Sequence, residues 1–249
     1  MPLTVYAVFY SSQLNDSIPP EIDLFSPESN VKLEYISANK LTAIVSLQTQ
    51  KNPVYSQQEV LAYASTVEKI SKLYSILPMR FGSVVGSIED LINLLQKYSD
   101  SFFEALDRVI NKEEYSLRLL FSHQYQSDNL NIEATENDQV TPAILLGNSD
   151  TKNYLLKKYQ KHIVEEQRHQ FIENIQSIVA QDIKKITEIF VFKKRVTPAI
   201  ILDAVLLIDR SAKSELLALA THIQCRYPEH NVIMTGPWPP YNFAQIKLE

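Results

Sequence analysis

The alternation of hydrophobic and polar positions predicts three strands at the start of the chain. Residues 3–10 are β-branched and aromatic without helical spacing, which is typical of a buried strand. Apolar and charged residues alternate over 31–35, the spacing of a strand with one buried face. Residues 41–47 are again apolar and follow a turn at 38–40, so we expect them to pair with the preceding strand as a hairpin.

Two amphipathic helices and a further strand follow in the predicted order. Residues 56–59 have the Ser-x-x-Glu spacing of a capping box, which begins a helix with one apolar stripe that ends before Pro78. A second capping signal at 87–90 begins a helix that we expect to reach residue 111, and 115–121 return to strand spacing. This order predicts a two-layer α+β domain, an antiparallel sheet with helices on one face, in a modified ferredoxin-like arrangement.

The second half of the chain predicts another α+β unit. Residues 122–139 are polar, with the composition of a mobile linker. A capping residue at 149 or 150 begins a helix that extends toward residue 185, roughly 50 Å at about 1.5 Å per residue. Strands at 186–193, 200–208 and 232–234 and a helix at 211–225 complete the unit. We therefore expect an N-terminal domain at residues 1–123, a linker at 124–148, a C-terminal α+β domain with one long helix at 149–235, and an aromatic, proline-rich tail at 236–249.

The tail has an unusual composition for a chain end. Its stretch 236–244 contains the single Trp of the chain and three of the twelve Pro residues. Proline fixes φ and removes a backbone donor, so we expect neither a helix nor a central strand here. An extended segment that carries Trp238, Tyr241 and Phe243 is suited to lie against another surface. That surface belongs either to the same chain or to a partner, and we favour Trp238 and Tyr241 holding the two domains together.

Composition and charge exclude several classes of protein. The 249 residues are 45% hydrophobic and 21% charged, as in globular proteins, and the net charge of −5 opposes binding to nucleic acid. The single cysteine, Cys225, excludes an internal disulfide. No apolar run approaches the roughly 20 residues of a membrane helix, and residues 1–10 lack the pattern of a signal peptide. We expect a soluble protein of the cytoplasm.

Candidate chemistry is sparse. His162, Glu166 and His169 share one face of the long helix, but a metal site in a helical bundle needs a second such set on facing helices, so we interpret them as a solvated face. Cys225 is expected to be a buried thiol at a helix end. The Arg80–Gly86 stretch could bind a small anion ahead of a helix, although a tight turn with Arg80 paired to a carboxylate is the simpler interpretation. We identify no catalytic residue, metal ligand or cofactor site.

Five segments carry a resemblance to one protein family. Residues 77–82 (Leu-Pro-Met-Arg-Phe-Gly), with Glu113–Arg118 beyond the second helix, resemble the LP-x-RFG…Ew-x-v-k pattern of the gas vesicle protein F/L family (GvpF/GvpL). Residues 235–243 resemble its C-terminal GPWPPY-x-F motif, residues 153–158 the opening of its long helix, and residues 204–208 its last core strand. The family motif residues are Pro78, Arg80, Phe81, Gly82, Gly236, Pro237, Trp238, Pro239, Pro240, Tyr241 and Phe243.

The resemblance implies an assembly role. Members of this family are accessory or minor components of gas vesicles, and they are associated with binding the hydrophobic shell protein GvpA and with nucleation of the shell. On this basis we expect GvpA and other gas vesicle accessory proteins as partners, location at gas vesicles within the cytoplasm, and no enzymatic activity, cofactor, nucleic acid or membrane. The alternative is an enzyme or small-anion-binding module that uses the Arg80–Gly86 turn.

Overall fold

The structure, a computed structural model, describes residues 1–14, 32–48, 56–122 and 149–246, without the side chains of 149–153. The chain divides into two compact units, each built from segments that are distant in sequence. Unit 1 contains residues 1–115, 205–213 and 235–249, and unit 2 contains residues 116–204 and 214–234. The linker expected at 124–148 lies outside the described residues, so the predicted domain boundaries stay a prediction.

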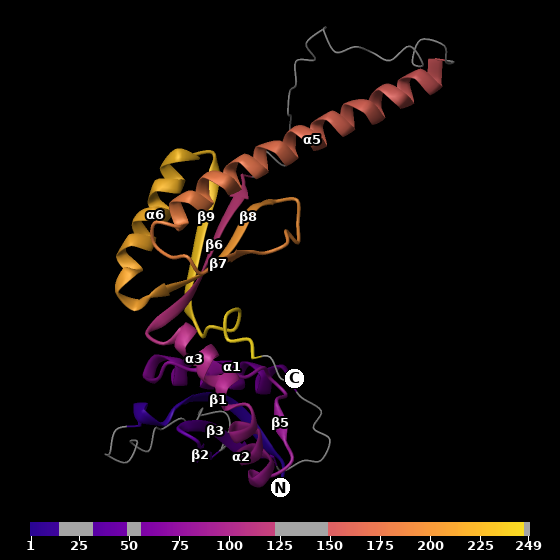
Figure 1. The fold of residues 1–249 in the computed structure, drawn as a ribbon. Coiled ribbons are helices and arrows are strands. Elements are labelled where there is room, and N and C mark those ends of the chain that lie inside the picture. The colour runs from indigo at the N-terminus through magenta and orange to yellow at the C-terminus, as the bar shows by residue number, and fades with distance from the viewer. Residues whose placement is uncertain (15–31, 49–55, 123–148, 247–249) are drawn as a thin grey trace. The chain divides into compact units, whose positions relative to one another are not determined.

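The sheet of unit 1 is antiparallel. Its strands are β1 (Leu3–Tyr10), β2 (Leu33–Ala38), β3 (Leu41–Leu47), β4 (Leu77–Pro78) and β5 (Val84–Val85), in the order β2-β3-β1-β4 with β5 also paired to β1 (Figure 1). Asn39 and Lys40 have φ of 49° and 65°, the backbone of a two-residue hairpin turn. The predicted hairpin of β2 and β3 is confirmed.

Three helices accompany this sheet. α1 (Gln57–Leu73) begins with the predicted capping box, in which Ser56 Oγ accepts from the Glu59 amide and the Glu59 carboxylate accepts from the Ser56 amide. The second predicted helix is in fact two, α2 (Ile88–Lys97) and α3 (Ser99–Val109). Tyr98, with φ −109° and ψ 22°, leaves the helical region between them. The apolar stripe keeps its spacing across this break, and for that reason the hydrophobic pattern did not reveal it.

Unit 1 has a continuous core around α1. A central group of eight buried residues comprises Tyr6, Ala7, Phe9, Ile44, Tyr63, Val67, Ile70 and Ile76. Tyr63 stacks on Tyr6 at 4.7 Å between ring centroids, and its hydroxyl donates a hydrogen bond to the carbonyl of Val5 at 2.9 Å. These two contacts fix α1 to β1. Nearly every residue of β1 and β3 is buried. Both faces of these strands are therefore covered, where the sequence pattern predicts a helix layer on one face.

The second sheet has four strands, and two helices accompany it in the described part of the chain. β6 (Lys112–Phe121), β7 (Phe190–Phe192), β8 (Ile200–Asp209) and β9 (His230–Trp238) follow the order β7-β8-β6-β9, and β6, β8 and β9 contribute residues to both units. The helices are α5 (Ser149–Ile183) and α6 (Lys213–Arg226), the latter after a short 3-10 turn at Arg210–Ala212. The mixed fold with antiparallel sheets is confirmed, whereas the ferredoxin-like arrangement stays a prediction. No helix in the described ranges is long and apolar enough to cross a membrane.

The last strand differs from the prediction. β9 was expected over 232–234, but it begins at His230 and continues through Gly236 and Pro237 to Trp238. The order of strands places β9 at an edge of the sheet. A proline is tolerated in an edge strand because its missing backbone N–H can lie on the side without a neighbouring strand. The tail, expected to be neither a helix nor a central strand, therefore begins as the end of an edge strand. β7, expected over 186–193, is shorter and spans Phe190–Phe192.

Candidate interaction site in the C-terminal segment

Gly236 lets the C-terminal segment approach β6 closely. Its φ is 126°, and a Cβ added there would lie 2.8 Å from both the carbonyl oxygen of Glu114 and a ring carbon of Tyr115. Any larger residue would therefore clash with backbone as well as with a buried ring. The glycine of the family motif is explained by this contact, which follows from its place beside β6.

Polar contacts fix the segment that follows. The buried carboxylate of Glu114 accepts a hydrogen bond from the Asn242 amide nitrogen at 2.9 Å and another from its side-chain Nδ2. Arg108 Nη1 donates to the carbonyl of Phe243 at 3.2 Å. The amide of Phe243 in turn donates to the carbonyl of Pro240 at 3.1 Å, which closes a turn. The bonds to Glu114 and Arg108 join residues far apart in sequence. Together with the turn they hold the segment in one conformation.

Its proline and aromatic residues divide into buried and exposed groups. Pro239, Pro240 and Phe243 are buried and act as anchors. Trp238 is 46% exposed and Tyr241 is 38% exposed. Partial burial nevertheless raises the pKa of the Tyr241 phenol to about 12. Because Trp238 is only about half buried, replacing it by alanine should cost less stability than the loss of a fully buried tryptophan would. The hypothesis that Trp238 and Tyr241 hold two domains together stays a prediction.

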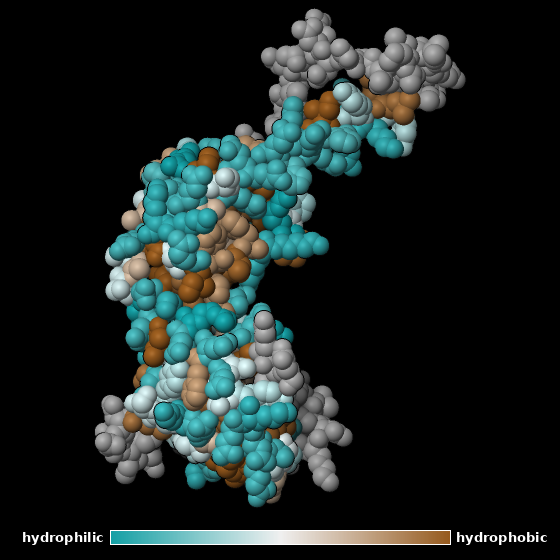
Figure 2. All heavy atoms as spheres, viewed as in Figure 1, coloured by the Kyte–Doolittle hydropathy of each residue, from teal (hydrophilic) through white to brown (hydrophobic). Residues whose placement is uncertain are grey.

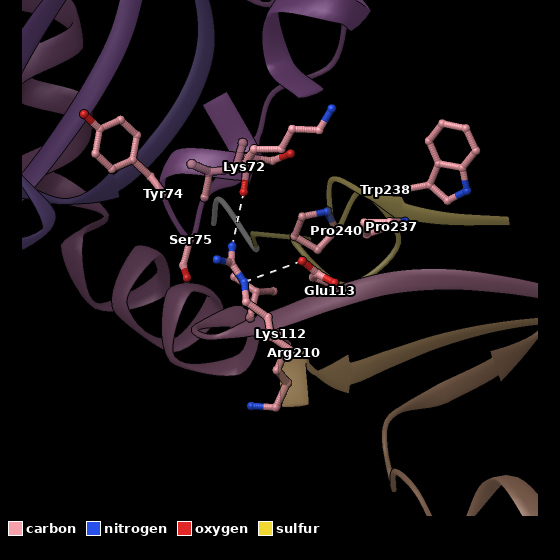
Figure 3. Close-up of a pocket in the computed structure, with 12 residues that line it drawn as sticks. Lys72, Tyr74, Ser75, Lys112, Glu113, Arg210, Pro237, Trp238 and Pro240 are labelled. Atoms are coloured by element: carbon pink, nitrogen blue, oxygen red, sulfur yellow. Dashed lines mark hydrogen bonds and ion pairs between the residues drawn. The ribbon is translucent and has the colours of Figure 1, made fainter. Parts of the chain in front are cut away.

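A small pocket lies beside Trp238 (Figure 3). It has a volume of about 30 Å³, room for about one water molecule, whereas sites for small molecules usually measure about 300–1,000 Å³. Arg210 crosses it, with Nη2 donating to the Ser71 carbonyl at 3.2 Å and Nε 3.7 Å from the Glu113 carboxylate. Figure 3 shows the indole of Trp238 directed away from this pair. The pocket is therefore a packing gap beside a displayed aromatic ring.

The Arg80–Gly86 stretch forms a structural turn. The Ser83 amide donates to the Arg80 carbonyl at 3.0 Å, and Gly82 supplies the positive φ of 85°. On its inner side Phe81 packs edge-on against Tyr63, at 5.3 Å between ring centroids, so the space there is filled. Arg80 is exposed and forms no ion pair with any described residue, contrary to the expected carboxylate partner. An exposed guanidinium is satisfied by water and needs none.

The start of α2, directly after this turn, does not favour an anion. Ser87 Oγ already accepts the Asp90 amide at 3.1 Å, and Glu89 and Asp90 place two carboxylates in the first turn. The positive end of the helix dipole is thus matched by the chain's own charges, which would repel a bound anion. Both observations favour the structural interpretation of the Arg80–Gly86 stretch over the anion-binding one.

The remaining candidate ligands are solvated. His162 lies 3.9 Å from Glu166 and His169 lies 3.5 Å from Glu173, each as an exposed pair one turn apart on α5. No group of three or more potential metal ligands occurs among the described residues. Cys225 is exposed instead of buried, because it lies off the stripe of α6 that buries Leu216, Leu219 and Ile223.

Sequence reasoning missed the polar half of the C-terminal site. Glu114 and Asn242 are separated by 128 positions, and neither has a local signal that marks it as buried or paired. A carboxylate beside a strand normally predicts a solvent-exposed position. Only the tertiary structure shows that Glu114 is buried and bonded to Asn242. The aromatic motif itself was identified correctly as unusual.

Comparison with known proteins places this fold in a family. The chain matches the model of the family described as gas vesicle synthesis protein GvpL/GvpF over residues 4–245. No curated protein sequence matches it. The crystal structure of the gas vesicle protein GvpF from Anabaena sp. PCC7120 is similar with a TM-score of 0.75 and 18% identity, covering 99% of this chain and 97% of that one. GvpF from Microcystis aeruginosa is similar with a TM-score of 0.67 and 14% identity, covering 98% and 99%. The match over almost the whole chain shows that this protein belongs to the GvpL/GvpF family of gas vesicle synthesis proteins.

Proposed function

We propose that the protein is a non-catalytic assembly factor that binds the hydrophobic gas vesicle shell protein GvpA and supports nucleation of the shell. The observation that carries the proposal is family membership combined with the half-exposed rings of Trp238 and Tyr241 on an otherwise anchored segment. An unassembled shell subunit has apolar surface that must be kept from aggregation. We further propose that the protein stays associated with gas vesicles in the cytoplasm, together with other gas vesicle proteins.

The two exposed rings are suited to this task. Aromatic side chains supply large apolar contact area with few rotatable bonds, which is why Trp and Tyr are enriched among residues that dominate binding energy. Here Pro239, Pro240 and Phe243 of the same segment are buried, and Asn242 is bonded to Glu114, so little ordering entropy remains to be lost on binding. The proposed contact surface is therefore preorganised.

The test is co-purification of tagged GvpA with this protein and with the variant Trp238→Ala/Tyr241→Ala. We expect the double variant to retain its fold and to recover at most about a tenth as much complex, since loss of an aromatic hot spot commonly exceeds 2 kcal/mol. The matched control is Tyr154→Ala/Tyr159→Ala, which removes two exposed rings from α5 and should leave recovery unchanged.

Two results would overturn the proposal. Absence of any complex with GvpA, together with absence of the protein from washed intact vesicles, would remove the assembly role altogether. Equal loss of complex in both double variants would retain the role but remove the C-terminal rings as its contact surface. Protease accessibility on intact and collapsed vesicles, read with an antibody to this protein, determines which side of the shell it occupies.

A further inference from the structure

Unit 2 contains an open hollow of about 480 Å³ between α5 and the loop that joins β7 to β8. α5 contributes Glu165, Arg168, His169 and Ile172, and the loop contributes residues 194–198. This volume lies within the range of sites that hold several side chains or a small ligand. The hollow is separate in composition from the C-terminal site, with which it shares no lining residue.

The charges around the hollow are unbalanced. Arg168, Lys194 and Arg195 are its cationic lining residues, and Lys193 precedes Lys194 in the loop. Glu165 is the one carboxylate among the lining residues, and it lies 3.9 Å from the ammonium group of Lys161. The net charge of the whole chain is −5, so this cluster of positive side chains has the opposite sign to the protein as a whole. Like charges gathered on one surface cost free energy unless a partner of opposite sign compensates them.

The loop is held in place by contacts at its ends and beside the helix. The Lys193 amide donates to the Asp203 carbonyl at 2.8 Å, and the Ala199 carbonyl accepts from the Phe121 amide at 2.9 Å. The guanidinium of Arg168 lies 4.7 Å from the centroid of the Phe121 ring and donates to the carbonyl of Pro198. Arg168 is therefore fixed by stacking and by a hydrogen bond. These two contacts do not use all the N–H donors of its guanidinium group. The hollow therefore has a preorganised cation among its lining residues.

The apolar part of the lining selects among anionic ligands. Ile172 and Pro198 form part of the wall, and Val196 is 84% exposed in the loop. The lining residues include no Phe, Tyr or Trp ring, and His169 is the one aromatic side chain among them, in contrast to surfaces that bind single-stranded nucleic acid through several stacking rings. In the loop the adjacent cations Lys194 and Arg195 are followed by Val196, so the hollow offers both charge and apolar contact to a peptide that carries carboxylates and an aliphatic side chain.

We propose that this basic hollow docks an acidic segment of a partner protein. Carboxylates of the segment pair with Lys194, Arg195 and the remaining donors of Arg168, while an aliphatic side chain between them contacts Ile172 and Val196. The inference does not depend on the proposed binding of a hydrophobic shell protein, because it concerns different residues and the opposite kind of chemistry.

The experiment measures fluorescence anisotropy of a labelled peptide of alternating glutamate and leucine in the presence of the full chain. The matched probe replaces each glutamate by glutamine. We expect the glutamate peptide to bind at least about tenfold more tightly than the glutamine peptide, and its affinity to fall as ionic strength rises toward about 0.3 M.

Charge reversal locates the binding. Lys194→Glu/Arg195→Glu should weaken binding of the glutamate peptide by about tenfold or more. The control Lys157→Glu/Lys158→Glu makes the same change in net charge on α5 outside the hollow and should shift affinity by less than about twofold. Circular dichroism establishes that both variants are folded.

Three outcomes overturn the proposal. Equal affinity for the glutamate and glutamine peptides would show that carboxylates are not recognised. Equal weakening by both charge-reversal variants would show general electrostatic attraction without a site. Tighter binding of a labelled single-stranded oligonucleotide, lost in the Lys194→Glu/Arg195→Glu variant, would assign the hollow to nucleic acid instead of an acidic peptide.

Discussion

The two halves of α5 are in opposite relations to solvent, although they form one continuous helix. In the second half Ile172, Ile175, Val179 and Ile183 are buried at helical spacing. In the first half the apolar side chains of residues 154, 155 and 159 are exposed, and Figure 2 shows hydrophobic patches among hydrophilic residues along this part. At about 100° per residue, the stripe formed by Leu155, Tyr159 and Ile163 lies on nearly the opposite side of the helix from the buried stripe.

This difference shows that length and helical spacing do not determine burial. The second half is stabilised by apolar burial, which contributes about 25 cal/mol for each Å² removed from water. The first half has exposed ion pairs one turn apart, such as Lys161 with Glu165 and His162 with Glu166, each of which contributes at most a few tenths of a kcal/mol. We therefore expect substitutions in the two halves to have very different effects on stability.

Truncation of a buried residue should have the largest effect. Ile175 is 1% exposed, so Ile175→Ala should lower the free energy of unfolding by about 2–5 kcal/mol through lost burial and the cavity left behind. Leu155 is 37% exposed, and Leu155→Ala should cost less than about 1 kcal/mol because the removed atoms lie partly in water already. Urea unfolding followed by circular dichroism measures both.

Equal costs would contradict the comparison. If Leu155→Ala destabilised the protein as much as Ile175→Ala, the first half of α5 would have to be packed in solution. If neither variant changed stability, the second half would not belong to the cooperative core, and the unfolding transition would have to be assigned to unit 1.

The next effect concerns pH and a histidine packed beside the second half of α5. His230 is buried, with its ring centroid 6.0 Å from Phe171 and 5.3 Å from Phe121. Burial lowers the pKa of its imidazole below the usual value near 6.5, an effect that Glu229 only partly offsets. The unfolded chain therefore takes up a proton below about pH 6.5 that the folded protein resists, and stability should fall as pH drops from there.

His230→Phe tests this pH dependence. The variant should remove part of the loss of stability between about pH 7 and pH 5, and that part measures the lowered pKa at about 1.4 kcal/mol per pKa unit. His162→Phe replaces an exposed histidine in the first half of α5 and serves as the matched control for the substitution itself. An acid limb that is identical in wild type and His230→Phe would show that His230 does not resist protonation in the folded protein.

Local signals in the sequence predicted local structure well. The capping box at residues 56–59, the hairpin turn at Asn39 and Lys40, and the start of α5 were identified because each depends on side chains within a few positions. The motif at 235–243 marked the C-terminal segment for the same reason.

Features set by tertiary contacts could not be predicted in this way. The extension of β9 through Pro237 depends on its place at the edge of a sheet, and the role of Glu114 depends on Asn242, which is 128 positions away. The apolar residues of α5 can be read from the sequence, but their spacing alone does not show which of its two stripes is covered by another element. Distance along the chain, more than chemical type, limited the prediction.

The smallest expected effect lies in the ion pairs of the two halves of α5. Lys161 and Glu165 are exposed and 3.9 Å apart, so a double-mutant cycle with Lys161→Ala and Glu165→Ala should give a coupling energy below about 0.5 kcal/mol. Asp182, at the end of α5, is largely buried and lies 3.2 Å from Arg226 Nη1. Its pKa is lowered chiefly by the hydrogen bond from Lys185, and its coupling to Arg226 should exceed that of the exposed pair.

Comparing the coupling energies from the two cycles is more informative than either value alone. Both pairs join one Asp or Glu to one Lys or Arg, so the difference in coupling energy reports the environment of the carboxylate. Raising the salt concentration to about 1 M should abolish the coupling of Lys161 with Glu165 and reduce that of Asp182 with Arg226 only in part, since buried pairs are screened less. Coupling energies that are equal and equally sensitive to salt would mean that the end of α5 is as open to water as its first half, contrary to the burial of Ile183 beside Asp182.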